Sequence, residues 1–514
     1  MPDSAAPDTP ARTIALGYST EGAALELGSV CIDGVADPEA RVRIPFATLN
    51  RHGLVAGATG TGKTKTLQGI AEQLSAAGVP VLLADVKGDL SGMARAGTSN
   101  AKIESRARDT GDDWAPTAYP VEFLSLGGSS SAVPIRATIT QFGPILLSKV
   151  LDLNDTQEST LGLIFHWADQ RRLPLLDTKD LRAVITHLTS DEGKADLKGI
   201  GGVSSATAGV ILRALVNLEA QGGEDFFGEP EFAPADLVRT VDGKGVVTLL
   251  ELADQAANPR LFSTFLMWLL AELFEELPEA GDLDKPKLVF FFDEAHLLFS
   301  DASKAFLQRI EQTVKLIRSK GVGVFFCTQL PTDVPNAVLS QLGARVQHAL
   351  RAFTPEDQSA LTKTVRTYPK TEHYDLEEAL TSLGTGEAIV TVLSERGAPT
   401  PVAWARMRAP RSLMAAIGGD EVTAAAKASA LYPKYGRTVD RESAYELLTA
   451  RIAQTPPPAA PWAEAPPPGR GEREEPGFLQ TALGSPVVKS FLRSAAGALG
   501  REITRGMFGT RRRR

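Results

Sequence analysis

Cysteine is scarce in this sequence: Cys31 and Cys327 are the only two among 514 residues, and they lie far apart. That number and spacing indicate neither a disulfide framework nor a cysteine zinc site. Long apolar runs are also rare, since the most apolar stretch, residues 261–274, is shorter than the roughly 20 residues that span a bilayer. The opening MPDSAAPDTPAR lacks the pattern of a secretory signal. We therefore expect a soluble, cytoplasmic protein without a membrane span.

Charge is distributed unevenly along the chain. The net charge is -8, yet residues 486–514 carry eight basic side chains against the single acid Glu502. Apolar residues recur there at helical spacing, which predicts a basic amphipathic helix. Its possible partners are an anionic membrane, giving a peripheral contact, nucleic acid, or an acidic groove on the protein's own body. The Pro-rich run at 455–477 before it is typical of a linker.

The stretch around residues 53–85 reads as a βαβ unit. GLVAG at 53–57 is a buried strand, a glycine-rich loop follows, and KTLQGIAEQLSAAG at 65–78 has apolar residues at helical spacing. VPVLLAD at 79–85 then resumes as a second strand. This alternation predicts an α/β fold with a mainly parallel sheet and helices packed on it.

Further along, the alternation is interrupted and then returns. Asp155 and Asp177 look like helix starts, whereas KLVFFFDE, VGVFFCTQ and a hairpin at 387–407 resume the strands. Short apolar runs such as TIALG within residues 12–45 predict strands near the N-terminus. We predict six segments: a small N-terminal β segment (1–45), the first half of the core (46–138), a helical insertion (139–235), the second half of the core (236–415), a helical stretch with the Pro-rich linker (416–485) and the basic C-terminal helix (486–514).

The glycine-rich loop matches the pattern G-x-x-x-x-G-K-[ST]. Its glycines let backbone N–H groups turn toward phosphate oxygens at a helix N-terminus, whose dipole favours negative charge. Lys63 is expected to reach the β- and γ-phosphates of ATP, and the Thr64 hydroxyl to bind Mg²⁺. The alternative is a strand-to-helix turn without a ligand. The predicted nucleotide-binding residues are Gly57, Ala58, Thr59, Gly60, Thr61, Gly62, Lys63, Thr64 and Lys65.

A second acidic motif, LVFFFDEAH, ends a buried strand in Asp293 and Glu294. Asp293 is expected to hold Mg²⁺ and Glu294 to polarise the attacking water as a general base. Carboxylates at the carboxyl end of a parallel strand lie where the ligands of such sheets bind. Simple capping of the strand end is the alternative, but the pairing with the glycine-rich loop favours hydrolysis of ATP.

Further polar residues are candidates with equally plausible structural roles. Gln329, at the end of VGVFFCTQ, is a candidate to sense the γ-phosphate or to be an ordinary strand-end amide. Arg318 is a candidate to supply charge to the transition state of a neighbouring subunit, or to interact only with its helix dipole. Asp85 either supports the Mg²⁺ shell or caps the turn made by Gly88. His296 and the other histidines show no metal-ligand spacing.

Whole phrases of the sequence resemble a known superfamily. The letters DEAH do not indicate a DEAH-box helicase, because SAT at 205–207 precedes them and no Arg-rich QRxGRxGR element follows. Instead, LNRHGLVAGATGTGKT, ADVKGDLSG, GDLDKPKLVFFFDEAHLLF and SKGVGVFFCTQLPTDVP resemble the HerA/FtsK superfamily of P-loop motor ATPases, and within it the bacterial YjgR-like family. The resemblance runs from about residue 12 to 410 and resumes in the tail.

The resemblance implies a RecA-like ATPase core that is commonly hexameric, with relatives that move DNA through a central channel. It also implies that Arg318 acts across the subunit boundary. We therefore predict a Mg-ATP-hydrolysing, ring-forming motor that translocates on DNA. The alternative is a nucleotide-gated oligomeric scaffold that acts on a protein partner, and the acidic body of the chain keeps that alternative open.

Overall fold

The computed structural model describes residues 9–85, 87–128, 131–197, 201–252, 259–281, 283–300, 302–394 and 396–454, without the side chains of 259 and 451–454. The predicted Pro-rich linker (455–477) and the basic C-terminal helix (486–514) lie outside the described residues. The domain boundaries expected from the sequence likewise stay predictions.

One twelve-stranded sheet organises the described residues, in the order β2-β1-β14-β13-β12-β3-β11-β10-β4-β9-β5-β6. Its strands from β12 to β6 are parallel, and those from β13 to β2 pair antiparallel. In chain order they are β1 (Ala24–Ile32), β2 (Val35–Pro45), β3 (Gly53–Ala56), β4 (Val81–Asp85), β5 (Val121–Leu126), β6 (Val133–Ile135), β9 (Val247–Glu251), β10 (Leu288–Phe292), β11 (Val322–Thr328), β12 (Ala344–Gln347), β13 (Glu387–Val392) and β14 (Ala403–Met407). A separate ribbon joins β7 (Thr240–Val241) to β8 (Lys244–Gly245).

The central strands are buried on both faces, which explains why they read as continuous apolar runs. Along β10, Phe290 and Phe292 belong to one hydrophobic cluster, whereas Val289 and Phe291 belong to another. Successive side chains of a strand point to opposite faces, so the two clusters lie on opposite sides of the sheet. The predicted α/β fold with a mainly parallel, RecA-like sheet is confirmed.

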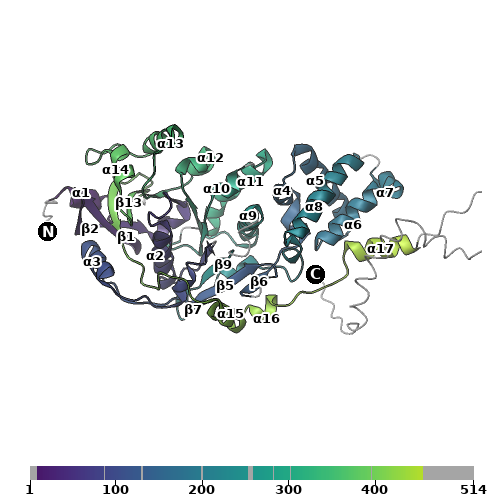
Figure 1. Cartoon of the computed structure of the whole chain (residues 1–514), viewed down its shortest axis with the longest axis horizontal. Helices are drawn as coiled ribbons and strands as arrows, with labels where there is room; N and C mark the ends of the chain where they lie inside the picture. Colours follow the sequence, from purple (N-terminus) through teal and green to yellow (C-terminus); the bar gives the residue numbers. More distant parts are fainter. Residues whose placement is uncertain are drawn as a thin grey trace, which may run out of the picture. The chain divides into compact units, whose positions relative to one another are not determined.

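The helices cover both faces of this sheet (Figure 1). In chain order they are α1 (Pro10–Leu16), α2 (Lys63–Ala76), α3 (Ala101–Thr110), α4 (Ile139–Val150), α5 (Asp155–Gln170), α6 (Thr178–Thr189), α7 (Asp191–Asp196), α8 (Ser205–Ala220), α9 (Pro259–Glu276), α10 (His296–Phe299), α11 (Lys304–Ile317), α12 (Asn336–Leu339), α13 (Pro355–Val365), α14 (Leu376–Ser382), α15 (Gly419–Ala428), α16 (Tyr432–Tyr435) and α17 (Ala444–Gln454). Helix α2 packs its apolar side chains on one face of the sheet, and α9 with α11 packs on the other.

Helices α4 to α8 form one group, drawn in blue to teal in Figure 1. Their starts follow capping chemistry, because the side chains of Asn154 and Asp177 each accept backbone N–H bonds within a capping box. Asp177 therefore caps α6 as a helix start. Asp155 is instead the first residue of α5, where its charge favours the helix dipole, and Asn154 is the cap.

One prediction about the N-terminal segment is wrong. The TIALG run, expected as a strand, lies in helix α1, which the side chain of Thr9 caps and Pro10 opens. Proline at the first helical position is a recognised helix start that the apolar pattern concealed. The strands β1 and β2 that follow join the large sheet through β14.

The most apolar segment of the sequence forms α9. Its side chains from Leu261 to Ala271 are buried, and α9 contacts α4, α10 and α11. Within the residues that the structure describes, no helix has the length and apolar character needed to cross a membrane.

Candidate nucleotide-binding site

The candidate site lies at the carboxyl edge of the parallel strands. Strand β11 separates β3 from β10, and all three run in the same direction. The glycine-rich loop that follows β3 and the Asp293–Glu294 pair that follows β10 therefore meet at one edge. Backbone bonds fix both segments to their neighbours: Gly57 N–H donates to the Thr328 carbonyl at 3.2 Å, and Ala295 N–H donates to the Cys327 carbonyl at 2.8 Å.

Gly57 and Gly62 of the glycine-rich loop combine positive φ angles with close neighbours. Gly57 has φ +149°, and a Cβ there would lie 2.6 Å from the Cβ of His348. Gly62 has φ +113° and lies so close to the backbone of Gly386 that a Cβ would be 3.0 Å from its nitrogen. An L side chain is strained at these angles, so both positions specify the loop conformation.

Helix α2 begins without a side-chain cap, because its N-cap residue is Gly62. Helices α5, α8 and α11 instead begin with Asn154, Ser204 and Ser303, whose side chains accept backbone N–H bonds. The first-turn N–H groups of α2 thus have no such acceptor at an end whose dipole favours negative charge. That arrangement suits a phosphate.

Lys63 lies inside the loop. Its ammonium group donates to the carbonyl oxygens of Gly57 and, at 3.2 Å, of Ala58. Burial lowers the pKa of Lys63, and the charges of Glu294 and Asp293 oppose that shift. The lysine and both carboxylates are therefore close enough to interact electrostatically, although they come from segments about 230 residues apart along the printed sequence.

The carboxylate pair is held in an unfavourable electrostatic state. Burial, and next the charge of Glu294, raises the pKa of Asp293 to about 6, against the opposing effects of Lys63 and Lys87. Glu294 has φ +47°, a left-handed conformation that is uncommon for a residue other than glycine. Backbone strain of this kind is typical of functional sites, where it fixes the direction of a side chain.

His348, which was not predicted from the sequence, packs against Gly57 of the loop and Thr66 of α2. It is fully buried, its Nδ1 lies 2.8 Å from the Glu387 carbonyl, and its Nε2 lies 3.0 Å from the Thr66 hydroxyl. Because a carbonyl only accepts, Nδ1 carries the proton and Nε2 accepts from Thr66. Burial lowers the pKa of His348 to about 4, so the imidazole is neutral at pH 7.

Two further basic residues near the loop were missed as well. Arg351 donates to the Thr59 carbonyl at 3.3 Å. Lys87 follows β4 and is close enough to affect the pKa values of Lys63 and Asp293. In the sequence, each of these residues is marked only by its position shortly after an apolar strand. Many surface residues share such a position, so it does not identify a site.

The remaining predicted residues are divided between the two edges of the sheet. Gln329 directly follows β11, is exposed, and so lies at the candidate site between the two motifs. Arg318 precedes β11 at the opposite edge, a strand of seven residues or roughly 20 Å away. Arg318 is thus not brought to the site of its own chain. Lys65, the last of the predicted nucleotide-binding residues, donates from its ammonium group to Gln68 on α2 at 3.1 Å.

Asp85 and His296 have structural partners. The Asp85 carboxylate is 2% exposed and accepts the backbone N–H groups of Lys87, Gly88 and Leu90. It therefore caps the turn made by Gly88, whereas a role in the Mg²⁺ shell stays a prediction. Nδ1 of His296 lies 3.4 Å from a Glu294 carboxylate oxygen, so this imidazole is in a position to orient Glu294.

A magnesium nucleotide fits the residues present. Glycines with positive φ, an uncapped helix start and Lys63 favour an anionic ligand. The Thr64 hydroxyl and the Asp293 carboxylate are hard oxygen donors, which Mg²⁺ prefers. A cation beside Asp293 would also offset the repulsion between Asp293 and Glu294, which contributes to the raised pKa of Asp293.

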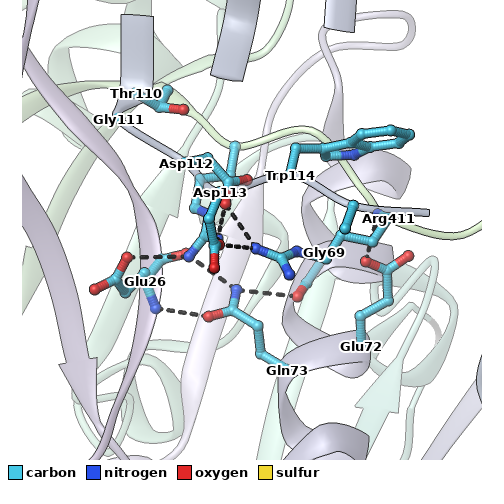
Figure 2. A network of polar contacts seen from close by, with 12 residues as sticks. Glu26, Gly69, Glu72, Gln73, Thr110, Gly111, Asp112, Asp113, Trp114 and Arg411 are labelled. Atoms are coloured by element: carbon cyan, nitrogen blue, oxygen red, sulfur yellow. Dashed lines mark hydrogen bonds and ion pairs between the residues drawn. The ribbon is translucent and has the colours of Figure 1, made fainter. Parts of the chain in front are cut away.

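A second polar cluster lies along α2 and is shown in Figure 2. We call it the Glu72 network. The Glu72 carboxylate accepts from Arg411 N–H at 2.7 Å and from Ser412 N–H at 3.0 Å. Arg411 and Arg408 both pair with Asp112, and Gln73 exchanges two hydrogen bonds with the Glu26 backbone. This network ties the segment after β14 to the helix that carries the glycine-rich loop.

Comparison with known proteins gives a match over most of the chain. Residues 32–514 match the family model described as helicase HerA-like C-terminal. The DNA double-strand break repair helicase HerA of Sulfurisphaera tokodaii is 24% identical over 369 residues, which is 71% of this chain and 66% of that protein. The match thus covers slightly less than two thirds of that relative's length.

Solved structures share the fold. The bacterial conjugative coupling protein TrwBdeltaN70 has a TM-score of 0.51 at 15% identity, over 80% of this chain and 95% of its own. TrwB in complex with ADP and Mg²⁺ has a TM-score of 0.51 at 16% identity, over 79% of this chain and 95% of its own. At such identity, the likeness supports the fold alone.

Proposed function

Because this chain belongs to the helicase HerA-like C-terminal family, we propose that it is a cytoplasmic, ring-forming motor ATPase that hydrolyses Mg-ATP and moves DNA. One observation carries the proposal. The glycine-rich loop and the Asp293–Glu294 pair, from distant parts of the sequence, meet at the carboxyl edge of one parallel sheet, with Lys63 near both carboxylates. Relatives that match the chain include a DNA repair helicase and a coupling protein solved with ADP and Mg²⁺.

Each residue has a defined task in this proposal. The N–H groups of the loop and the Lys63 ammonium bind the β- and γ-phosphates, while Thr64 and Asp293 hold the metal ion. Mg²⁺ supplies charge neutralisation on the transferring phosphoryl group when it is bound. Glu294 accepts a proton from the attacking water, and Gln329, between the two motifs, orients that water. His348 keeps Thr66 and the loop in place.

Arg318 acts on the neighbouring subunit in this proposal. We assign it to the neighbour because it lies at the opposite edge of the sheet from the nucleotide site of its own chain. In a ring whose subunits pack head to tail, one edge meets the opposite edge of the next subunit, so Arg318 would complete the neighbour's site.

Mixing of inactive variants tests the ring. Lys63→Ala and Arg318→Ala subunits are each expected to lose most ATP hydrolysis. Loss of the arginine should lower the rate of hydrolysis about a hundredfold or more. A mixture of the two is expected to regain activity, since some interfaces then combine an intact Lys63 with an intact Arg318. Activity of the mixture equal to that of the separate variants would contradict action across the boundary.

Polynucleotide stimulation tests the motor. The rate of ATP hydrolysis is expected to rise on addition of duplex DNA, and the effect should weaken steeply as salt increases. The Lys63→Ala variant is the control for contaminating ATPases. A rate that stays flat with single-stranded, duplex and forked DNA, together with ATP-dependent assembly in sizing, would instead favour the nucleotide-gated scaffold.

A further inference from the structure

Phe353 is the most exposed large apolar side chain among the described residues, with 86% of its surface open. Its backbone is nevertheless fixed. The Phe353 N–H donates to the Asp357 carboxylate at 3.1 Å, and the capping box of Thr354 and Asp357 starts α13 directly after it. The Gln358 side chain also donates to the Ala352 carbonyl at 3.0 Å. The fold therefore presents this aromatic ring to the outside of the chain at a defined position.

Phe353 follows a segment that lies beside the glycine-rich loop. The segment after β12 runs beside the loop, because Ala58 N–H donates to the Ala349 carbonyl at 2.8 Å. Two residues further, Arg351 donates to the Thr59 carbonyl at the loop's tip. Phe353 follows Arg351 by two residues, so their Cα atoms are at most about 7 Å apart.

The order of the strands indicates which end of a nucleotide faces Phe353. Asp293 and Glu294 follow β10, whereas Phe353 follows β12, and β3 with its loop lies between these two strands. Since Asp293 would bind the metal ion that accompanies the γ-phosphate, the nucleoside end of the molecule would extend to the other side. Strands β10 and β12 are three strand spacings apart, about 14 Å, which leaves room for a nucleotide lying across the loop.

We propose that Phe353 stacks on the base of the bound nucleotide and so contributes to selection for a nucleoside triphosphate over other polyphosphates. An aromatic face is a good partner for a base, because every base has a π-face and stacking tolerates different bases. Arg351, bonded to the loop tip, positions the segment. This inference rests on the proposed function, since it concerns the ligand of the same site.

Calorimetry on the full-length protein tests the inference with two ligands, Mg-ATP and Mg-tripolyphosphate, which lacks ribose and base. The Phe353→Ala variant is expected to bind Mg-ATP about tenfold more weakly or worse, as for loss of one stacked base, while its affinity for Mg-tripolyphosphate stays that of the parent. Phe353→Trp is expected to retain Mg-ATP affinity because it still presents an aromatic ring to the base. Val35→Ala, which changes another exposed apolar side chain on the edge strand β2, is the matched control and is expected to change neither affinity.

Three outcomes would overturn the inference. Unchanged Mg-ATP affinity in Phe353→Ala would show that the ring does not contact the nucleotide. An equal loss of both affinities, with a smaller oligomer in sizing, would place Phe353 at an interface with a second copy instead. If the parent bound neither ligand, the phosphate site itself would be wrong and the proposed function would fall with it; a parent that binds both ligands keeps the two questions separate.

Discussion

The candidate nucleotide site and the Glu72 network both bury charged groups beside α2, yet they differ in how those charges are paired. In the Glu72 network, a buried carboxylate accepts two backbone N–H groups, and arginines pair with Asp112. At the nucleotide site, two carboxylates stand side by side, Glu294 is in a left-handed conformation and the pKa of Asp293 is raised to about 6. In the first arrangement the charged groups have partners within the chain, whereas the second is suited to an external cation and phosphate.

The difference shows that burial of charge alone does not identify a functional site. Burial raises the pKa of Glu72 as well, and a cavity of about 530 Å³ borders its network. Two features separate the clusters: the repulsion between Asp293 and Glu294, which Lys63 and Lys87 offset only in part, and the strained backbone of Glu294. A protein maintains such features only where the surrounding fold enforces them. Substitutions at Glu294, Glu72 and His348 test this contrast.

Replacement of Glu294 by Gln is expected to have the largest effect. The amide keeps the shape of the side chain but accepts no proton from water, so hydrolysis should fall about a thousandfold, or ~4 kcal/mol in the barrier. Calorimetry should show that Mg-ATP still binds. Single-turnover hydrolysis at the parental rate would sink the role assigned to Glu294.

Replacement of Glu72 by Ala is expected to change stability and leave the chemistry intact. Removal of the carboxylate leaves the backbone N–H groups of Arg411 and Ser412 and the Ser412 hydroxyl without this acceptor, which should lower the unfolding free energy by about 3 kcal/mol. Denaturant unfolding measures this loss, and Glu39→Ala, at an exposed acid, is the control with a change within about 0.5 kcal/mol. A drop in turnover per folded molecule comparable to that of Glu294→Gln would contradict the contrast.

A smaller loss of stability is expected at acid pH because of His348. The pKa of His348 is about 4 in the folded protein, against an ordinary value of 6.5 in the unfolded chain, so the unfolded chain binds more protons between these pH values. The stability that the neutral imidazole provides is complete above about pH 6.5 and is lost as pH falls toward 4, by about 3 kcal/mol. His348→Gln should therefore weaken the pH dependence of unfolding between pH 7 and 4.5, whereas His373→Gln, at an exposed histidine, should not. Identical pH profiles for the parent and His348→Gln would refute this account.

Much of the site follows from local sequence. A strand, glycines at fixed positions and Lys63 specify the loop, because only glycine adopts its backbone angles without strain. Two acids after five apolar residues likewise predict a buried strand with carboxylates at its end. The helix α1 was missed, since its few apolar residues fit a short strand as well as a short helix and only Thr9 and Pro10 distinguished them.

The amino-acid pattern was enough to predict the α/β class, the phosphate-binding loop and the acidic pair, because each depends on neighbours within a few positions of the chain. The three-dimensional fold adds that β11 lies between the two motifs, that His348 and Arg351 contact the loop and its helix, and that Arg318 lies at the opposite edge of the sheet. Such contacts join residues hundreds of positions apart, and they exist only once strand order and direction are set. Local pattern carries no information on that order, so His348 and Arg351, which belong to no motif, gave no signal in advance.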